Sequence, residues 1–102
     1  MAGFRHVRLM LTPRAEDYID KLKQDTALND PIVQIGWGRW DHETEDHWQL
    51  GLNERSNVSG AAWHGIAPEF EFFVLHPALF DRLEGCILDI TEGTPKVSDD
   101  AT

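Results

Sequence analysis

The segment Ile32–Leu52, IVQIGWGRWDHETEDHWQLGL, has the pattern of a β-hairpin with a polar tip. Apolar residues alternate with polar or small ones in both arms, at Val33, Ile35, Trp37, Trp48, Leu50 and Leu52. A period of two is typical of a strand with one buried face. Residues 39–47 between the arms hold two histidines and four carboxylates. We therefore expect two structural arms and a tip that is available for function.

A chain of 102 residues is long enough for one modest hydrophobic core and too short for two domains. Its hydrophobic content of 41%, with four Trp and five Phe, is sufficient for a globular fold. The formal net charge of -9 disfavours nucleic acid and anionic membranes as partners, because their phosphates would be repelled.

The N-terminal segment MAGFRHVRLMLTPRAED lacks the apolar core of a signal peptide, and no apolar run approaches the length of a membrane span. We therefore expect a cytoplasmic protein. Cys86 is the only cysteine. An internal disulfide is thus excluded, and no all-thiolate metal site can form within one chain.

Before the hairpin, the sequence predicts a strand over residues 4–11 and then a helix. Thr12 can cap the free amides at the helix start, and Pro13 at the first helical position loses no hydrogen bond. The helix should end near Lys23 or Gln24, ahead of a turn rich in Asn, Asp and Pro.

After the hairpin, four elements are expected in order: a loop over Asn53–Gly60, a short strand over Ala61–Trp63, a tight turn at His64-Gly65 and a returning strand over Ile66–Leu75. Apolar residues occupy both alternating sides of the returning strand, so both of its faces should be covered. Pro68 should lie at an edge or a bulge of that strand, because proline cannot donate to a ladder.

His76-Pro77 predicts the start of a second, short helix that runs through Glu84. Gly85 should end this helix, as glycine often does just past a helix C-terminus. Residues Cys86–Ile90 are then expected to form the last strand.

Residues 91–102 are polar and predict a loose tail. We accordingly assign residues 1–93 to the domain and residues 94–102 to a flexible tail. The predicted order β-α-β-β-β-β-α-β, with mostly hairpin connections, indicates an α+β domain whose largely antiparallel sheet curls on itself.

Several segments resemble the A-type iron–sulfur carrier family, of the HesB/IscA type. Residues 11–15 (LTPRA) resemble that family's L-T-P-x-A opening of the first helix, and residues 83–90 (LEGCILDI) resemble its L-x-G-x-x-[I/L]-D-[Y/I] ending. Residues 36–38 stand where the family has its glycines, and residues 64–66 resemble its turn into the following strand. The resemblance spans residues 9–93 and implies a HesB/IscA-like fold.

The resemblance implies descent from proteins of iron–sulfur cluster biosynthesis, without their metal ligands. The family binds iron or a cluster through a cysteine after the glycines and through a Cys-Gly-Cys near its C-terminus. Residues 39–47 contain no cysteine, the sequence contains no Cys-Gly-Cys, and Cys86 does not stand at a ligand position. We therefore expect a non-enzymatic protein without a cofactor. Bound iron, and use of Cys86 across a dimer, stay open.

The densest set of potential metal ligands is residues 41–47, from which we select His42, Glu43 and His47. On a helix the two histidines would point about 140° apart. This excludes the zinc motif H-E-x-x-H, in which both histidines lie on one face of a helix. On a strand they would lie on opposite faces. Only a folded-back loop could bring them together. The alternative is a solvated acidic hairpin tip.

Trp40 and Asp41 are the candidate contacts for a protein partner or a small ligand. Trp40 lies beyond the regular alternation of the hairpin and should be exposed, whereas the alternation places Trp37 and Trp48 in the core. An exposed tryptophan beside carboxylates suits a protein or small-ligand contact.

Three classes of function follow from these residues. The first is binding of a protein or small ligand, and the second is metal binding at the tip. The third is an enzyme that uses Cys86 or a histidine, although the sequence shows no base and orienting group for a nucleophile. We expect Cys86 to be a small core residue, and His64 and His76 to satisfy backbone groups.

Overall fold

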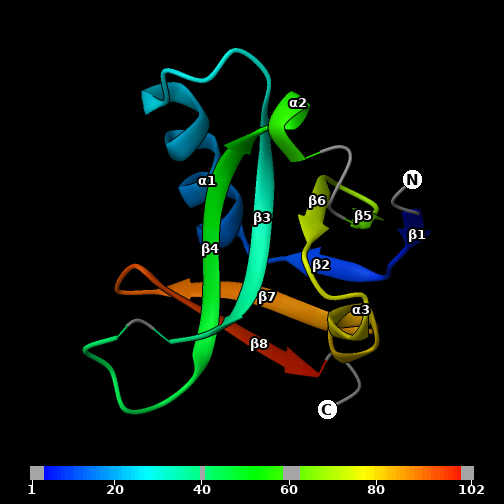
Figure 1. The fold of residues 1–102 in the computed structure, drawn as a ribbon. Helices are drawn as coiled ribbons and strands as arrows, with labels where there is room; N and C mark the ends of the chain where they lie inside the picture. The colour runs from blue at the N-terminus through cyan, green and yellow to red at the C-terminus, as the bar shows by residue number, and fades with distance from the viewer. Residues whose placement is uncertain (1–3, 40, 59–62, 100–102) are drawn as a thin grey trace.

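Two β-sheets that share one core organise the described part of the chain, residues 4–39, 41–58 and 63–99 of the computed structural model (Figure 1). These ranges contain eight strands and three helices, which make an α+β domain as expected. The strands of the smaller sheet run across the long hairpin of the larger one (Figure 1). Trp40 and residues 61–62 lie outside the described residues.

The larger sheet has five strands, in the spatial order β1 (Phe4–His6), β5 (Trp63–Ile66), β6 (Glu71–Val74), β3 (Pro31–Gly38) and β4 (His47–Glu54). β3 with β4 and β5 with β6 are antiparallel hairpins. Parallel pairing joins β1 to β5 and β6 to β3. The hairpin predicted from the alternation is confirmed, since Val33 pairs with Leu52 and Ile35 with Leu50.

The smaller sheet has three strands, in the order β2 (Leu9–Leu11), β7 (Cys86–Thr91) and β8 (Thr94–Asp99). β2 runs parallel to β7, and β7 is antiparallel to β8. The expectation of one sheet and of a single strand over residues 4–11 is therefore wrong. The chain leaves the larger sheet at Val7, whose amide donates to the Ile66 carbonyl at 3.0 Å, and enters the smaller sheet at Leu9.

The three helices are α1 (Pro13–Asp25), α2 (Arg55–Val58) and α3 (Ala78–Leu83). Thr12 caps α1 as predicted, because its side chain accepts a hydrogen bond from the Ala15 amide. Helix α2 occupies part of the predicted loop 53–60. None of the helices in the described ranges is long and apolar enough to span a membrane.

Both sheets and helices α1 and α3 contribute to the main core, which includes Leu9, Ile19, Ile35, Phe72, Phe80, Leu83 and Leu88. A second, smaller cluster lies on the other face of the larger sheet and consists of Ile32, Val58 and Phe73. Phe72 and Phe73 thus point to opposite faces and are both fully buried. This arrangement confirms that β6 is covered on both sides.

The predicted tight turn at His64-Gly65 is wrong, because both residues lie within β5. Glycine at position 65 instead allows the backbone to lie close to the ring of Phe72, because a Cβ added there would lie 2.3 Å from that ring. Glycine inside a strand often marks such a close approach. The chain turns at residues 67–70, where the Ala67 amide donates to the Phe70 carbonyl at 3.0 Å. Pro68 lies in this turn, not in a strand.

Residues 94–99 form strand β8, where composition predicts a loose tail. A two-residue turn produces this pairing, since Thr91 pairs with Thr94 across Glu92 and Gly93. Both turn residues have positive φ, 54° for Glu92 and 77° for Gly93. Two successive positive φ angles are the signature of the type I′ hairpin turn. Residues 94–99 therefore extend the smaller sheet.

Candidate functional site at the hairpin end

The tip between β3 and β4 folds back on itself. Arg39 donates from Nη1 to the Thr44 carbonyl at 3.0 Å, and its Nε lies 4.0 Å from a carboxylate oxygen of Asp46. Residues 42–47 line an open depression of about 380 Å³. The folded-back loop that the sequence requires for convergence of these side chains is therefore present.

Glu43 and His47 are brought together in this loop. The Nε2 atom of His47 lies 2.9 Å from the Glu43 carboxylate. Its Nδ1 lies 2.9 Å from the Trp48 carbonyl oxygen, and a carbonyl can only accept. Both ring nitrogens thus face acceptors, which favours a proton on each. The hydrogen bond with Glu43, followed by that with Trp48, raises the pKa of His47 above its ordinary 6.5.

The remaining predicted ligands do not complete a metal site. His42 lines the same depression as Glu43 and His47 but is exposed, as is Asp41. Over residues 4–39, 41–58 and 63–99, no three His, Cys, Asp or Glu side chains lie close enough together to hold a metal ion. Metal binding through His47 would also require loss of the proton that Glu43 favours on Nε2. Trp40 lies outside the described residues.

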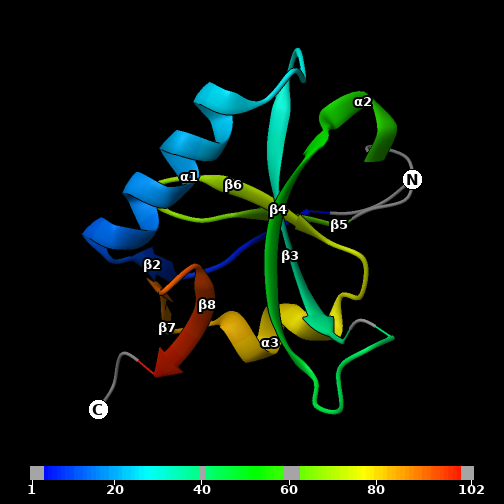
Figure 2. The same cartoon turned by 90° about the vertical axis from the view of Figure 1, so that its left-hand side faces the viewer.

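Two tryptophans and one arginine form a cluster at the hairpin end that the sequence pattern does not indicate. Trp37 and Trp48 form the next-to-last pair of the hairpin, with ring centroids 5.2 Å apart and an interplanar angle of 71°. Cζ of Arg82 lies 4.2 Å from the ring centroid of Trp37 and 4.7 Å from that of Trp48. Figure 2 shows α3, which carries Arg82, beside the ends of β3 and β4.

The prediction that Trp37 belongs to the core is wrong, since 39% of the residue is exposed. Trp37 does lie on the inner face with Val33 and Ile35. At this end of the hairpin, however, α3 contributes an exposed arginine, not an apolar side chain, to cover the ring. Residues 37 and 82 are far apart in the sequence, so no local pattern could have revealed their contact.

Cys86 lies half-buried at the start of β7 and packs against the core. Its thiol donates to the Arg82 carbonyl at 3.2 Å. Burial, followed by the negative charges of Asp99 and Glu84, raises the pKa of this thiol. A protonated thiol is neither a nucleophile nor a cluster ligand. One such cysteine does not fit an iron–sulfur cluster, which requires several thiolates.

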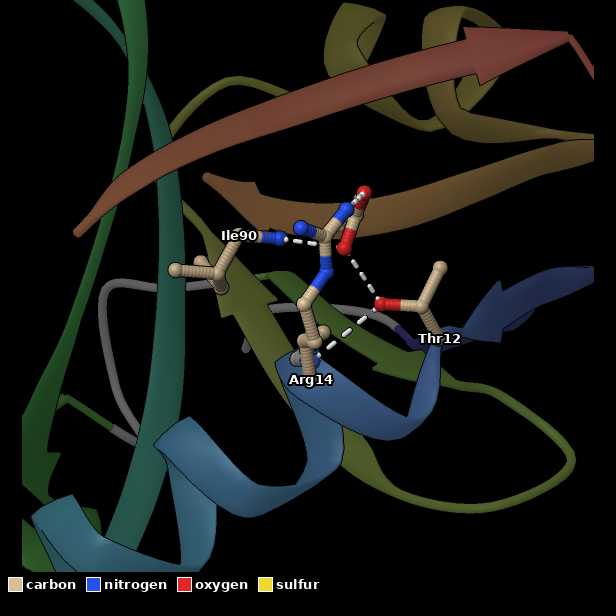
Figure 3. A network of polar contacts seen from close by, with 5 residues as sticks. Thr12, Arg14 and Ile90 are labelled. Atoms are coloured by element: carbon tan, nitrogen blue, oxygen red, sulfur yellow. Dashed lines mark hydrogen bonds and ion pairs between the residues drawn. The ribbon is translucent and has the colours of Figure 1, made fainter. Parts of the chain in front are cut away.

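A second polar cluster joins the start of α1 to β7 (Figure 3). The hydroxyl of Thr12 and the guanidinium of Arg14 each lie 2.6 Å from a different oxygen of Asp89. The Ile90 amide donates to the same carboxylate at 2.8 Å. The hydrogen bond from Thr12, helped by those from Arg14 and Ile90, lowers the pKa of Asp89. We call Thr12, Arg14, Asp89 and Ile90 the helix–strand junction.

No protein-family model matches the sequence, and no similar curated protein is found. The assignment of function therefore rests on the residues and contacts described above.

Proposed function

We propose that this protein is a non-enzymatic, HesB/IscA-like protein related to iron–sulfur cluster biosynthesis, and that it acts by binding a protein partner at the hairpin end. The observation that carries the proposal is the partial exposure of Trp37, at 39%, next to the acidic tip. Tryptophan supplies a large apolar area with a polar N–H, and it is enriched in protein interfaces.

The family relation is supported by where the resembling segments lie. Residues 11–15 and 83–90 are far apart in the sequence, yet they meet at the helix–strand junction through Thr12 and Asp89. They also pair as neighbouring strands, Leu11 with Leu88. Segments that hold a fold together are expected to contact one another, so these motifs have a structural reason to occur together.

A binding role without catalysis is supported by the state of the candidate reactive groups. The Cys86 thiol is held protonated against the Arg82 carbonyl. The imidazole of His47 is engaged at both nitrogens by Glu43 and by the Trp48 carbonyl. A general base needs a free nitrogen within reach of its substrate.

Site-specific photo-crosslinking tests the proposed contact surface. A photo-reactive amino acid replaces Thr44 in the tip, and the matched control carries it at Thr94, another exposed threonine, in β8. In the host cell we expect one discrete crosslinked protein from position 44 and none from position 94. Equal crosslinking at both positions, or none at position 44, would refute the hairpin end as the partner surface.

Metal binding at the tip is the second candidate, favoured by the approach of His47 to Glu43. Elemental analysis and an absorption spectrum of protein purified without oxygen distinguish the two candidates. The binding proposal predicts less than stoichiometric metal and no visible absorption. Stoichiometric iron or zinc that is lost in His47→Ala would instead establish the metal site.

A further inference from the structure

The pair Trp37 and Trp48 already holds a guanidinium group. We propose that this pair is the binding site for an arginine of a basic protein segment, and that Arg82 occupies the site when the partner is absent. The inference rests on the proposed function, because it names the partner class for the same surface.

The geometry of the pair is that of a receptor for a planar cation. A guanidinium is attracted to an aromatic face when it lies within about 6 Å of the ring centroid. Cζ of Arg82 satisfies this for both rings, at 4.2 and 4.7 Å. The two indoles meet edge to face, and the Arg82 guanidinium lies against both rings. Arginine suits such a site better than lysine because its flat guanidinium stacks on indoles.

Arg82 is held differently from three arginines of the domain that form close ion pairs. Arg5, Arg14 and Arg55 each contact a carboxylate at 2.8, 2.6 and 2.9 Å, respectively. Within the described ranges, no carboxylate oxygen lies within 4.0 Å of the Arg82 guanidinium nitrogens. The Arg82 side chain is exposed, and another guanidinium could replace it on the rings without breaking an ion pair.

Charge selects a basic segment as the occupant. The tip that adjoins the two tryptophans carries carboxylates at Asp41, Glu43, Glu45 and Asp46, and the chain has a net charge of -9. These carboxylates would attract the basic residues that flank a bound arginine, over a Debye length of about 8 Å at physiological ionic strength. The same charge repels nucleic acids and acidic proteins.

Displacement is tested with a defined probe, the peptide acetyl-Gly-Arg-Gly-Arg-Gly-amide, titrated against the whole protein while tryptophan fluorescence is recorded. Its lysine counterpart serves as the ligand control. Arg82→Ala should bind the arginine peptide roughly fivefold more tightly than wild type, because the competing side chain is gone. Arg8→Ala is the matched control, since it removes the same charge from another exposed arginine.

Trp37→Ala should abolish binding, whereas Trp63→Ala, which removes a residue that is 37% exposed elsewhere, should not. Indole N–H resonances provide a second measurement on wild-type protein: those of Trp37 and Trp48 should shift on titration and that of Trp63 should stay.

Equal affinity of Arg82→Ala and Arg8→Ala, equal binding of the lysine peptide, or no binding by any variant overturns the inference. A crosslink from position 44 with no peptide binding would leave the proposed function standing and reject only this partner class.

Discussion

The helix–strand junction and the hairpin tip are both polar clusters built on a carboxylate. The junction connects residues that are distant in the sequence, whereas the tip connects residues that are close in the sequence. At the junction, the contacts of Asp89 with Thr12 and Arg14 join residues 77 and 75 positions apart in the sequence. At the tip, Glu43 and His47 are four positions apart, and Arg39 and Thr44 are five. The junction therefore ties separate elements together, whereas the tip mainly orders itself.

This difference predicts how the stability of each region responds to the loss of a contact by substitution. Loss of a contact at or near the junction should lower the stability of the whole domain, because α1 and β7 both belong to the core. Loss of a contact at the tip should open only residues 39–46, since local units can open without global unfolding. The following substitutions test that contrast, in order of decreasing expected effect.

The largest effect is expected from Gly85→Val, next to the junction at the start of β7. Gly85 has φ of 76°, a conformation that costs an L-residue about 1–2 kcal/mol, and more when it is β-branched. Gly38→Val, at the hairpin end, is the matched control because an added Cβ meets nothing within 4 Å. Urea denaturation should show that the free energy of unfolding falls by about 2 kcal/mol only for Gly85→Val. Equal losses in the two variants would contradict the predicted difference between the junction and the hairpin end.

Thr12→Ala should lower the free energy of unfolding by about 1–2 kcal/mol, because it removes the cap of α1 and the bond to Asp89. Thr44→Ala removes an exposed threonine of the tip and should change stability by less than about 0.5 kcal/mol. Thermal denaturation of the two variants side by side checks the prediction. A Thr12→Ala variant as stable as Thr44→Ala would show that the junction is dispensable.

A smaller, pH-dependent effect is expected from Asp89, because the side chain of Arg14 is 66% exposed and water screens the pair. The pKa of Asp89 is lowered in the folded protein from its ordinary 3.8. Its charged form therefore stabilises the domain above that value, and the contribution disappears as pH falls through the folded pKa. The stability difference between wild type and Asp89→Asn should shrink below about pH 4. A difference that is constant down to pH 2 would contradict this role.

The smallest effect on global stability is expected at the tip. There the pH dependence of the contribution to stability is opposite to that of Asp89. The pKa of His47 is raised in the folded protein, so its contribution is present below pH 6.5 and is lost as pH rises through the folded value. Glu43→Gln should change global stability by less than about 0.5 kcal/mol. Amide hydrogen exchange near residues 43–47 should nevertheless accelerate in this variant below pH 6.5. Faster exchange throughout β3 and β4 would show that the tip is part of the cooperative unit.

The features that sequence analysis predicted correctly are those with a local cause. The hairpin arms follow from the alternation over residues 33–38 and 48–52, which lies within two strands of eight residues each. The start of α1 follows from Thr12 and Pro13, and the end of α3 follows from Gly85, which has a positive φ just past the helix. Such features depend on neighbouring residues alone. The approach of Glu43 to His47 is also local, and it required only that the tip fold back.

The features that were missed depend on distant partners. The sequence predicts a turn at Gly65 because the contact of this residue with Phe72 is not visible in the sequence. The sequence predicts Trp37 in the core because alternation indicates which face of a strand a residue lies on. It does not indicate what covers that face, which here is Arg82 of α3. Strand β8 had a local indication after all: Gly93 follows the last apolar strand at the distance of a tight hairpin turn.

The division of the N-terminal segment between two sheets has a consequence for the kinetics of folding. β1 pairs with β5 and β2 pairs with β7, so Leu9 finds its partner Cys86 near the other end of the chain. The three hairpins can close early because their loops are short, whereas such distant pairings close large loops and form slowly. During synthesis, β1 must wait unpaired until β5 has left the ribosome, and β2 until β7 has done so. The first strands to be made are thus expected to be the last to join their sheets.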